Sequence, residues 1–273
     1  MGSQCTWAAG RAARSSGYAA YFSESLGRGR PADSGRNVSH SPLFATAEFA
    51  TSVAELDALP DAPLALLPEL AFVGRSNSGK STAINLLTQR RRLAFSSKTP
   101  GRTQMLNFFA VQDDAPLAQR QPCAYLVDLP GYGFAKADAM TRDRWDALVG
   151  GYLYERSTLR GVVLVMDARR PCLPADEDLI AWICRRVDLE TFRLHMLLSK
   201  ADQVGTMEGR AALARAERRA AELPMPTSVQ LYSALDRRGL DELRDAAAQI
   251  LQEDAADGDV AADPNTTPDP PHP

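Results

Sequence analysis

The stretch "AFVGRSNSGKST", residues 71–82, decides the fold. An apolar run ends at Gly74, and the residues up to Ser81 match G-x-x-x-x-G-K-[ST], the pattern of a phosphate-binding P-loop. Glycines let the backbone curl until successive N–H groups point inward, and the helix expected next begins with free N–H groups and a positive dipole end. We therefore predict that nucleotide phosphates bind to Gly74, Arg75, Ser76, Asn77, Ser78, Gly79, Lys80 and Ser81.

Two side chains of this loop have separate expected roles. Lys80 reaches the β- and γ-phosphates, and the hydroxyl of Ser81 is a ligand for Mg²⁺. The alternative interpretation is an ordinary glycine turn. The strand before the loop and the helix after it favour the nucleotide site, because the motif requires that context.

Outward from the loop, short apolar runs alternate with longer amphipathic segments. This alternation predicts an α/β fold, with a mostly parallel six-stranded sheet and helices on both faces. The connection 112–122 is too short and too polar for a crossover helix, so we expect one antiparallel hairpin at the sheet edge. The expected strands are 69–74, 105–111, 123–131, 161–167, 192–200 and 227–234, and the expected helices are 80–90, 138–159, 174–188, 207–223 and 239–252.

The two ends of the chain differ in composition from the middle. Residues 1–42 are rich in Gly, Ala, Ser and Arg, and residues 253–273 are acidic and proline-rich, so both are expected to be disordered around a domain at 43–252. The first segment resembles an organelle transit peptide. We favour the other interpretation, a start assigned upstream of the true domain in a bacterial cytoplasmic protein.

The overall composition excludes several classes of protein. The formal net charge is −3, so no global basic field indicates a nucleic-acid partner. The four cysteines form no C-x-x-C pair, which favours free thiols over a zinc site or a disulfide framework. His195 lies in an apolar run, where a hydrogen-bonded core position is expected. No apolar stretch approaches the length of a membrane span, so no membrane partner is expected.

A second motif follows the hairpin. The run "LVDLPG" places Asp128, Leu129, Pro130 and Gly131 at the end of an apolar strand. A carboxylate there can hold the Mg²⁺ shell, and a glycine N–H can approach a γ-phosphate closely. An isolated D-x-x-G is a weak signal, but its position one hairpin after the P-loop favours the functional interpretation.

The last two strand ends predict the recognition of a base. In "SKAD", Asp202 is placed to accept from the N1–H and the 2-amino group of guanine, a pair of donors that adenine lacks. Lys200 can lay its stem against the ring. In "YSALD", the backbone N–H of Ala234 can meet the guanine O6. The predicted base site comprises Ser199, Lys200, Ala201, Asp202, Tyr232, Ser233 and Ala234.

Together these motifs resemble the EngB/YihA-type GTPases of the TrmE–Era–EngA–EngB superfamily. The resemblance covers about residues 43–252. It implies a three-layer, Ras-like P-loop GTPase fold, Mg²⁺-dependent GTP binding with slow hydrolysis, and roles in large ribosomal subunit assembly and in septation during cell division. The motifs that carry it are Gly74–Ser81, "SSKTPGRTQMLNFF" (96–109), "DLPGYGFAK" (128–136), "SKAD" (199–202) and "YSALDRRGLDEL" (232–243).

The resemblance also assigns roles to individual residues. Thr103 is similar to the switch threonine that ligates Mg²⁺ beside Ser81, with Thr99 as a nearby rival. Tyr132 stands where Ras has the glutamine that orients the attacking water. Asn77 either binds a K⁺ ion beside the phosphates or only shapes the loop. The residues expected against the nucleotide are Gly101, Arg102, Thr103, Gln104 and Met105, and those expected to act in hydrolysis are Lys80, Asn77, Thr103 and Gly131.

The segment 89–103 holds five basic residues and no acid. With the resemblance, we expect it to contact ribosomal RNA in a large-subunit precursor, although a charge run is often only a solvated face. We expect a monomer. Two rival functions stay open, a P-loop ATPase or small-molecule kinase, and a GTP-binding scaffold without significant turnover.

Overall fold

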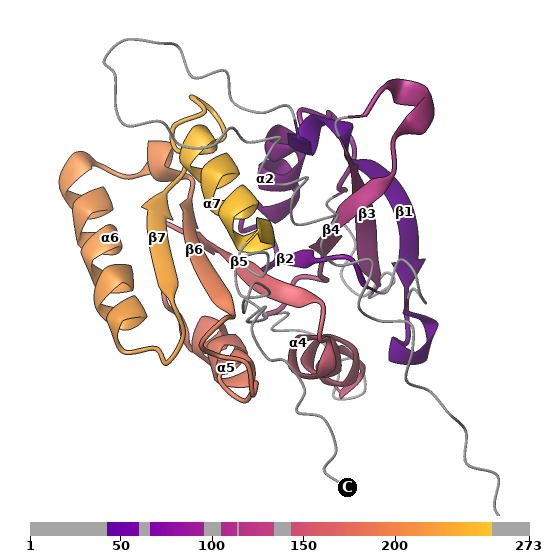
Figure 1. Ribbon diagram of the computed structural model, residues 1–273. Helices are drawn as coiled ribbons and strands as arrows, with labels where there is room; N and C mark the ends of the chain where they lie inside the picture. The colour runs from indigo at the N-terminus through magenta and orange to yellow at the C-terminus, as the bar shows by residue number, and fades with distance from the viewer. Residues whose placement is uncertain (1–42, 60–65, 96–104, 114, 134–142, 253–273) are drawn as a thin grey trace, which may run out of the picture.

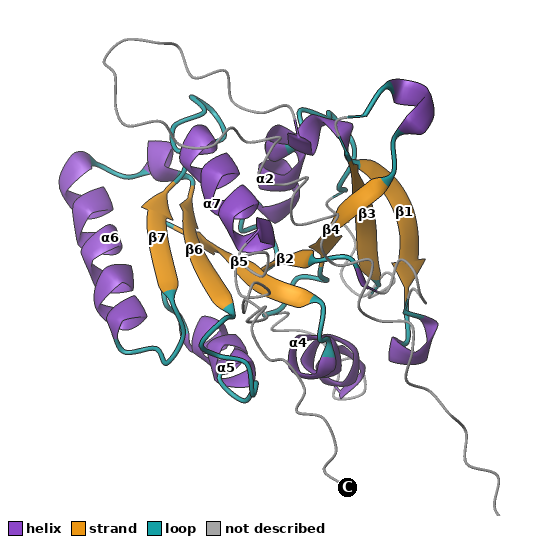
Figure 2. Cartoon of the chain, viewed as in Figure 1, coloured by secondary structure: helices purple, strands orange, loops and turns teal. Residues whose placement is uncertain are grey.

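The computed structural model describes residues 43–59, 66–95, 105–113, 115–133 and 143–252 (Figure 1). The segments expected to be disordered, 1–42 and 253–273, lie outside the described residues. The described part is a central sheet between two layers of helices (Figures 1 and 2), which is the three-layer α/β architecture that the sequence predicts.

The sheet has seven strands in the order β1-β3-β4-β2-β5-β6-β7. Five neighbouring strands, β4, β2, β5, β6 and β7, are parallel to one another. Their nearly continuous apolar sequences follow from burial on both faces. The strands are β1 (Glu48–Val53), β2 (Glu69–Gly74), β3 (Leu106–Gln112), β4 (Pro122–Asp128), β5 (Leu159–Asp167), β6 (Arg193–Ser199) and β7 (Thr227–Leu231).

The antiparallel edge is one strand wider than the sequence predicts. The expected hairpin is present, with β3 antiparallel to β4, but β1 adds a seventh strand that pairs antiparallel with β3. The count of six strands is therefore corrected to seven. Only Val53 of β1 is buried, so the strand needs few apolar residues. Its sequence "EFATSV" accordingly contains no apolar run that would distinguish it from a loop. Its register with β3 also shifts between Phe49 and Thr51.

The helices cover both faces of the sheet. Helices α2 and α7 contribute to one buried apolar cluster, whereas α4, α5 and α6 contribute to the other cluster, on the opposite face. The α-helices are α2 (Lys80–Leu87), α4 (Gly151–Glu155), α5 (Pro174–Ile183), α6 (Thr206–Ala221) and α7 (Leu240–Gln252), and a π-helical turn, Asp146–Gly150, leads into α4. Single 3₁₀ turns lie at Leu43–Thr46, Leu56–Ala58, Leu117–Gln119 and Ala201–Gln203.

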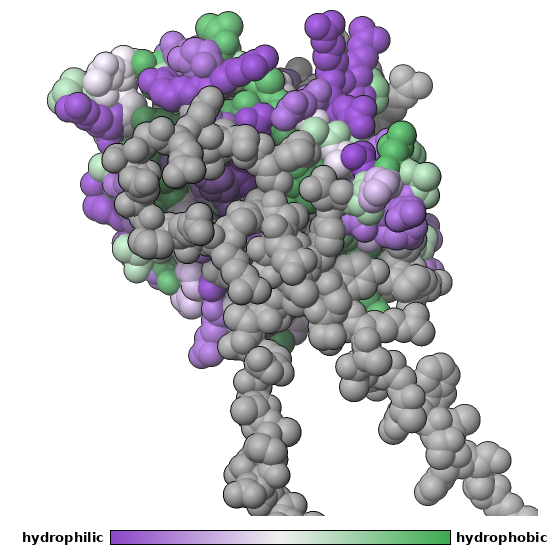
Figure 3. All heavy atoms as spheres, turned by 45° about the horizontal axis from the view of Figure 1, so that its top comes forward, coloured by the Kyte–Doolittle hydropathy of each residue, from purple (hydrophilic) through white to green (hydrophobic). Residues whose placement is uncertain are grey.

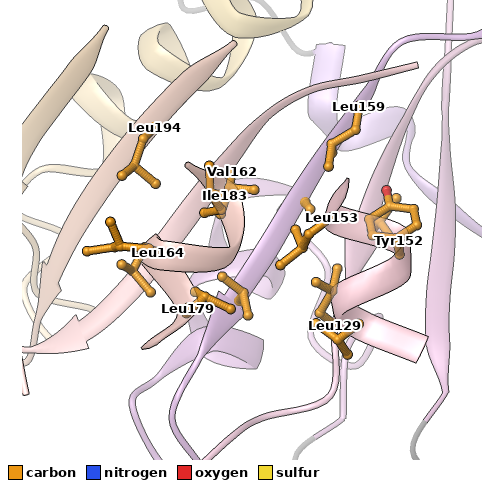
Figure 4. Close-up of a cluster of buried hydrophobic side chains, with 14 of the residues drawn as sticks. Leu129, Tyr152, Leu153, Leu159, Val162, Leu164, Leu179, Ile183 and Leu194 are labelled. Atoms are coloured by element: carbon orange, nitrogen blue, oxygen red, sulfur yellow. The ribbon is translucent and has the colours of Figure 1, made fainter. Parts of the chain in front are cut away.

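One buried cluster shows how the elements are held together. Figure 4 shows Tyr152 and Leu153 of α4 and Leu179 and Ile183 of α5 in one buried cluster with strand residues such as Val162. Burying large apolar side chains of this kind stabilises the fold by roughly 1.5–3 kcal/mol for each. On the face shown in Figure 3, the described residues that are visible include hydrophilic side chains with hydrophobic ones among them. The packing of the helices against the sheet in this buried cluster fixes the strand ends, where the predicted motifs lie.

The interpretation of His195 as a core residue is confirmed. Its ring is buried, with Nδ1 2.8 Å from Ser228 Oγ and Nε2 3.0 Å from Gln230 Oε1. Burial lowers its pKa to about 4, because the charged form loses its hydration. Both ring nitrogens therefore have partners within the structure. Among the described residues, Cys123, Cys172 and Cys184 are free thiols, and no helix is both long and apolar enough to cross a membrane.

Candidate nucleotide-binding site

The P-loop joins the end of β2 to the start of α2. Asn77 and Gly79 have left-handed backbones, with φ of 65° and 99°, and the curl of the loop depends on them. Gly74 has no room for a side chain, because a Cβ there would lie 2.5 Å from the carbonyl oxygen of Val165. The positive φ of Gly79 and the lack of space at Gly74 are the physical reasons for the two glycines of the motif.

Lys80 and Asp128 meet at the base of this loop, where the lysine ammonium group donates to Asp128 Oδ1. Asp128 is buried, which raises its pKa, while the charge of Lys80 and its hydrogen bond oppose the increase. Ser81 is also buried, in the first turn of α2. The structure therefore brings the lysine predicted to bind phosphate into contact with the carboxylate predicted to hold the magnesium shell.

The "DLPG" segment runs directly alongside the P-loop. The N–H of Leu129 donates to Phe72 O at 3.0 Å, and that of Ser76 donates to Tyr132 O at 3.1 Å. A Cβ on Gly131 would lie 3.1 Å from Ser76 Oγ, so only glycine fits without displacing that hydroxyl. Gly131 therefore lies directly against the P-loop, and the approach of its N–H to a γ-phosphate stays a prediction.

The end of β6 braces the P-loop from the other side. Ser199 Oγ donates to Ser78 O, and Lys200 Nζ donates to Asn77 O at 2.5 Å. Lys200 also lies 3.0 Å from Asp167 Oδ2. The hydroxyl of Ser199 and the ammonium group of Lys200 therefore both brace the P-loop backbone.

The two predicted base-recognition segments are adjacent. Ser233 Oγ donates to Asp202 Oδ1 at 2.9 Å, and Ala201 N donates to Tyr232 O at 3.0 Å. Asp202 itself is exposed and Ser233 is fully buried, so a buried hydroxyl orients an accessible carboxylate. Ala234 follows directly after this pair.

Of the switch residues expected against the nucleotide, the structure describes only Met105. Met105 is half-buried just before β3. Thr99, Gly101, Arg102, Thr103 and Gln104 lie outside the described residues.

Sequence reasoning missed one wall of the site. A cavity of about 410 Å³ lies between the P-loop and the segment that joins β5 to α5. Asp167 in this wall accepts from Arg169 at 2.8 and 2.6 Å, and these hydrogen bonds lower its pKa. An aspartate at the end of an apolar strand identified Asp128, and the same signal would have found Asp167. The cavity is lined by Arg75, Ser76, Asn77, Ser78, Met166, Asp167, Arg169, Arg170, Asp176 and Lys200.

Comparison with known proteins places this site in a class. Residues 69–198 match the family model described as 50S ribosome-binding GTPase. With the P-loop at the end of β2 and a mostly parallel sheet, the chain is a P-loop GTPase.

Individual relatives narrow the class to a family. A probable GTP-binding protein EngB from Cupriavidus taiwanensis is 44% identical over 200 residues, which cover 71% of this chain and 81% of the relative. Another, from Thiobacillus denitrificans, is 44% identical over 201 residues, which cover 74% and 89%. The chain belongs to the EngB family of GTP-binding proteins, as its motifs indicate. A crystal structure of a probable GTP-binding protein engB is 19% identical, with a TM-score of 0.49, over 68% of this chain and 99% of that chain.

Proposed function

We propose that this chain is a slow, Mg²⁺-dependent GTPase switch that selects guanine through Asp202. The observation that carries the proposal is the place of Lys200, which donates to the P-loop at Asn77 O and lies two residues before Asp202. One short segment thus connects the phosphate site to the base site. Asp202 presents an exposed carboxylate, oriented by Ser233, to the paired donors of guanine.

The residues at the P-loop fit a magnesium ion. Ser81 offers a hydroxyl and Asp128 a carboxylate, both hard oxygen donors of the kind that Mg²⁺ prefers together with water and phosphate oxygens. In the described part of the chain, no cluster of three or more His, Cys, Asp or Glu side chains offers a competing metal site. We propose that Ser81 ligates the ion directly, with Thr103, and that Asp128 holds its water shell. When bound, the ion offsets the negative charge of the phosphates.

Competition for a fluorescent GDP tests nucleotide selectivity. We expect GTP to displace the probe at concentrations at least about a hundredfold lower than ATP does, because adenine leaves Asp202 unpaired. Chelating Mg²⁺ should weaken GTP binding. Equal displacement by ATP would instead support the ATPase or small-molecule kinase, and GTP binding without phosphate release would support the scaffold.

Asn77 is proposed to help bind a K⁺ ion beside the phosphates. Its side chain is exposed, and its amide makes no hydrogen bond to another residue in the part of the chain that the structure describes. The amide oxygen is therefore available to a cation. The charge of K⁺ would stabilise the transition state where Tyr132 replaces the water-orienting glutamine. Faster GTP turnover in K⁺ than in Na⁺ is expected, and equal rates would leave Asn77 with a role in loop shape alone.

We propose that 89–103 is a partner surface for ribosomal RNA of a large-subunit precursor. The protein is proposed to act as a monomer in the bacterial cytoplasm and to have a link to septation. In its described part, Arg90, Arg91 and Arg92 are exposed. The side chain of Asn85 makes three hydrogen bonds of 2.8 to 2.9 Å to the backbone of Leu93 and Ala94, which follow Arg92. The arginines therefore project from a fixed turn rather than from a loose loop.

Replacing these three arginines with alanine should weaken RNA binding and flatten its salt dependence, since each phosphate contact releases counterions. Arg210 and Arg218, exposed on α6, provide matched control positions. If substitutions on α6 weaken RNA binding as much as those at the turn do, the proposed surface is wrong.

A further inference from the structure

The residue after D-x-x-G makes an unexpected contact. Tyr132 Oη donates to Asp176 Oδ1 at 2.6 Å, and the two residues are only 6% and 1% exposed. The second carboxylate oxygen of Asp176 accepts from Leu173 N at 2.8 Å, at the start of α5. Both oxygens of one buried carboxylate are therefore used, one by α5 and one by the segment beside the P-loop.

The backbone of Tyr132 is fixed as firmly as its side chain. It forms a parallel bridge with Arg75, in which Ser76 N donates to Tyr132 O at 3.1 Å. The ring of Trp145 meets the Tyr132 ring edge-on, with 6.0 Å between ring centroids, and Trp145 Nε1 donates to Pro130 O at 3.1 Å. Gly131 lies between these anchors, so its position depends on the residues on either side of it.

A charged group of the P-loop completes the arrangement. The side chain of Arg75 lies across Gly133, where a Cβ would be 3.1 Å from Arg75 Nε. Burial raises the pKa of Asp176. The positive charge of Arg75 opposes this increase, because it favours the ionised form of the Asp176 carboxylate. The Nε atom is buried with no hydrogen-bond partner in the described residues, so Arg75 acts here through its charge.

We propose that Asp176 is a positioning residue for the nucleotide site. By holding Tyr132, it fixes where the N–H of Gly131 lies beside the P-loop, and so prepares that N–H for the γ-phosphate. The inference rests on the proposed GTP-binding function. It explains why the chain has a tyrosine at this position, because a glutamine is too short to fill the ring site beside Trp145 and lacks the hydroxyl that binds Asp176.

The proposal predicts a split between two nucleotides. GDP has no γ-phosphate, so it does not use the N–H of Gly131. Replacing Tyr132 with phenylalanine removes a single oxygen. We expect the affinity for a non-hydrolysable GTP analogue to fall about tenfold, the size of effect that corresponds to about 1.4 kcal/mol, while the affinity for GDP stays within about twofold.

The Asp176→Ala variant supplies the second arm. Because both substitutions remove the same hydrogen bond, the double variant should show no further loss in the ratio of analogue affinity to GDP affinity. Tyr154→Phe is the matched control, since Tyr154 is 49% exposed on α4. Thermal unfolding of each variant separates misfolding from mispositioning. If Asp176→Ala does not fold, Tyr132→Phe decides alone.

Two outcomes would overturn the proposal. Unchanged affinities for both the analogue and GDP in Tyr132→Phe would show that the contact does not position Gly131, and equal weakening of the two would show a structural role only. A wild-type protein that binds neither guanine nucleotide would instead overturn the proposed function, and this inference with it. Measuring wild-type binding first therefore separates the two failures.

Discussion

The Asp202→Asn variant is expected to lose GTP affinity by about a thousandfold. The carboxylate can accept from two guanine donors at once, and an asparagine can accept from only one. Its amide group would also face a guanine N–H, donor against donor. Leaving a buried donor unpaired costs about 1–3 kcal/mol for each group, so two such losses reach this magnitude.

The same variant should gain affinity for xanthine nucleotides. Xanthine carries a carbonyl where guanine has its 2-amino group, and the new amide can donate to that oxygen. The carboxamide oxygen can still accept from Ser233, as Asp202 Oδ1 does at 2.9 Å, so the local fold should survive. Competition against fluorescent GDP measures both changes in one assay.

Asp178→Asn is the matched control, because Asp178 is an exposed aspartate on α5. It removes the same charge and should leave the affinity for GTP unchanged. If Asp202→Asn binds GTP as tightly as the control does, the assignment of the base site is wrong. If it loses GTP without gaining xanthine nucleotides, the carboxylate stabilises the loop and does not read the base.

The motifs of the site could be predicted because each is short and lies at a strand end. Gly74 to Ser81, Asp128 to Gly131, and Asp202 are local patterns, and a parallel sheet brings its carboxyl ends to one edge. The fold class followed from the same alternation of strands and helices. These predictions needed no knowledge of distant contacts.

The missed features depend on partners that are far away in the sequence. Strand β1 lies at an edge with one mostly exposed face, so it carries no apolar run. Asp176 reads as an ordinary acidic residue near the start of a helix, and its partner Tyr132 precedes it by 44 residues. Glu69 reads as a polar residue opening a strand, yet it is completely buried. Only the folded chain shows these pairs.

Glu69→Ala is expected to destabilise the protein by about 3–5 kcal/mol. Glu69 begins β2 and accepts from three side chains that lie between the start of α4 and the start of β5. Arg156 Nε lies 2.8 Å from Oε1, Thr158 Oγ1 lies 2.9 Å from the same oxygen, and Tyr152 Oη donates to Oε2 at 2.6 Å. The carboxylate thus joins β2 to the end of α4.

Removing the carboxylate costs more than its own hydrogen bonds. The Arg156 side chain is only 12% exposed, so its charge would be left largely buried without a counterion. The hydroxyls of Tyr152 and Thr158, both buried, would lose their acceptor as well. Since whole domains are stable by only about 5–15 kcal/mol, this single change should remove a large fraction of the total.

Urea unfolding provides the measurement, as a lower midpoint at an unchanged slope. Glu177→Ala is the control, since its ion pair with Arg219 has a similar length, 2.8 Å, but lies at the surface with side chains 35% and 28% exposed. That pair should contribute less than about 1 kcal/mol. Glu69 is the first residue of β2 and Gly74, where the P-loop begins, is the last, so the two lie at opposite ends of the strand. Folded Glu69→Ala protein should therefore still bind GDP. Equal losses in the two variants would mean that the Glu69 network is held together by packing and that its buried charges contribute little.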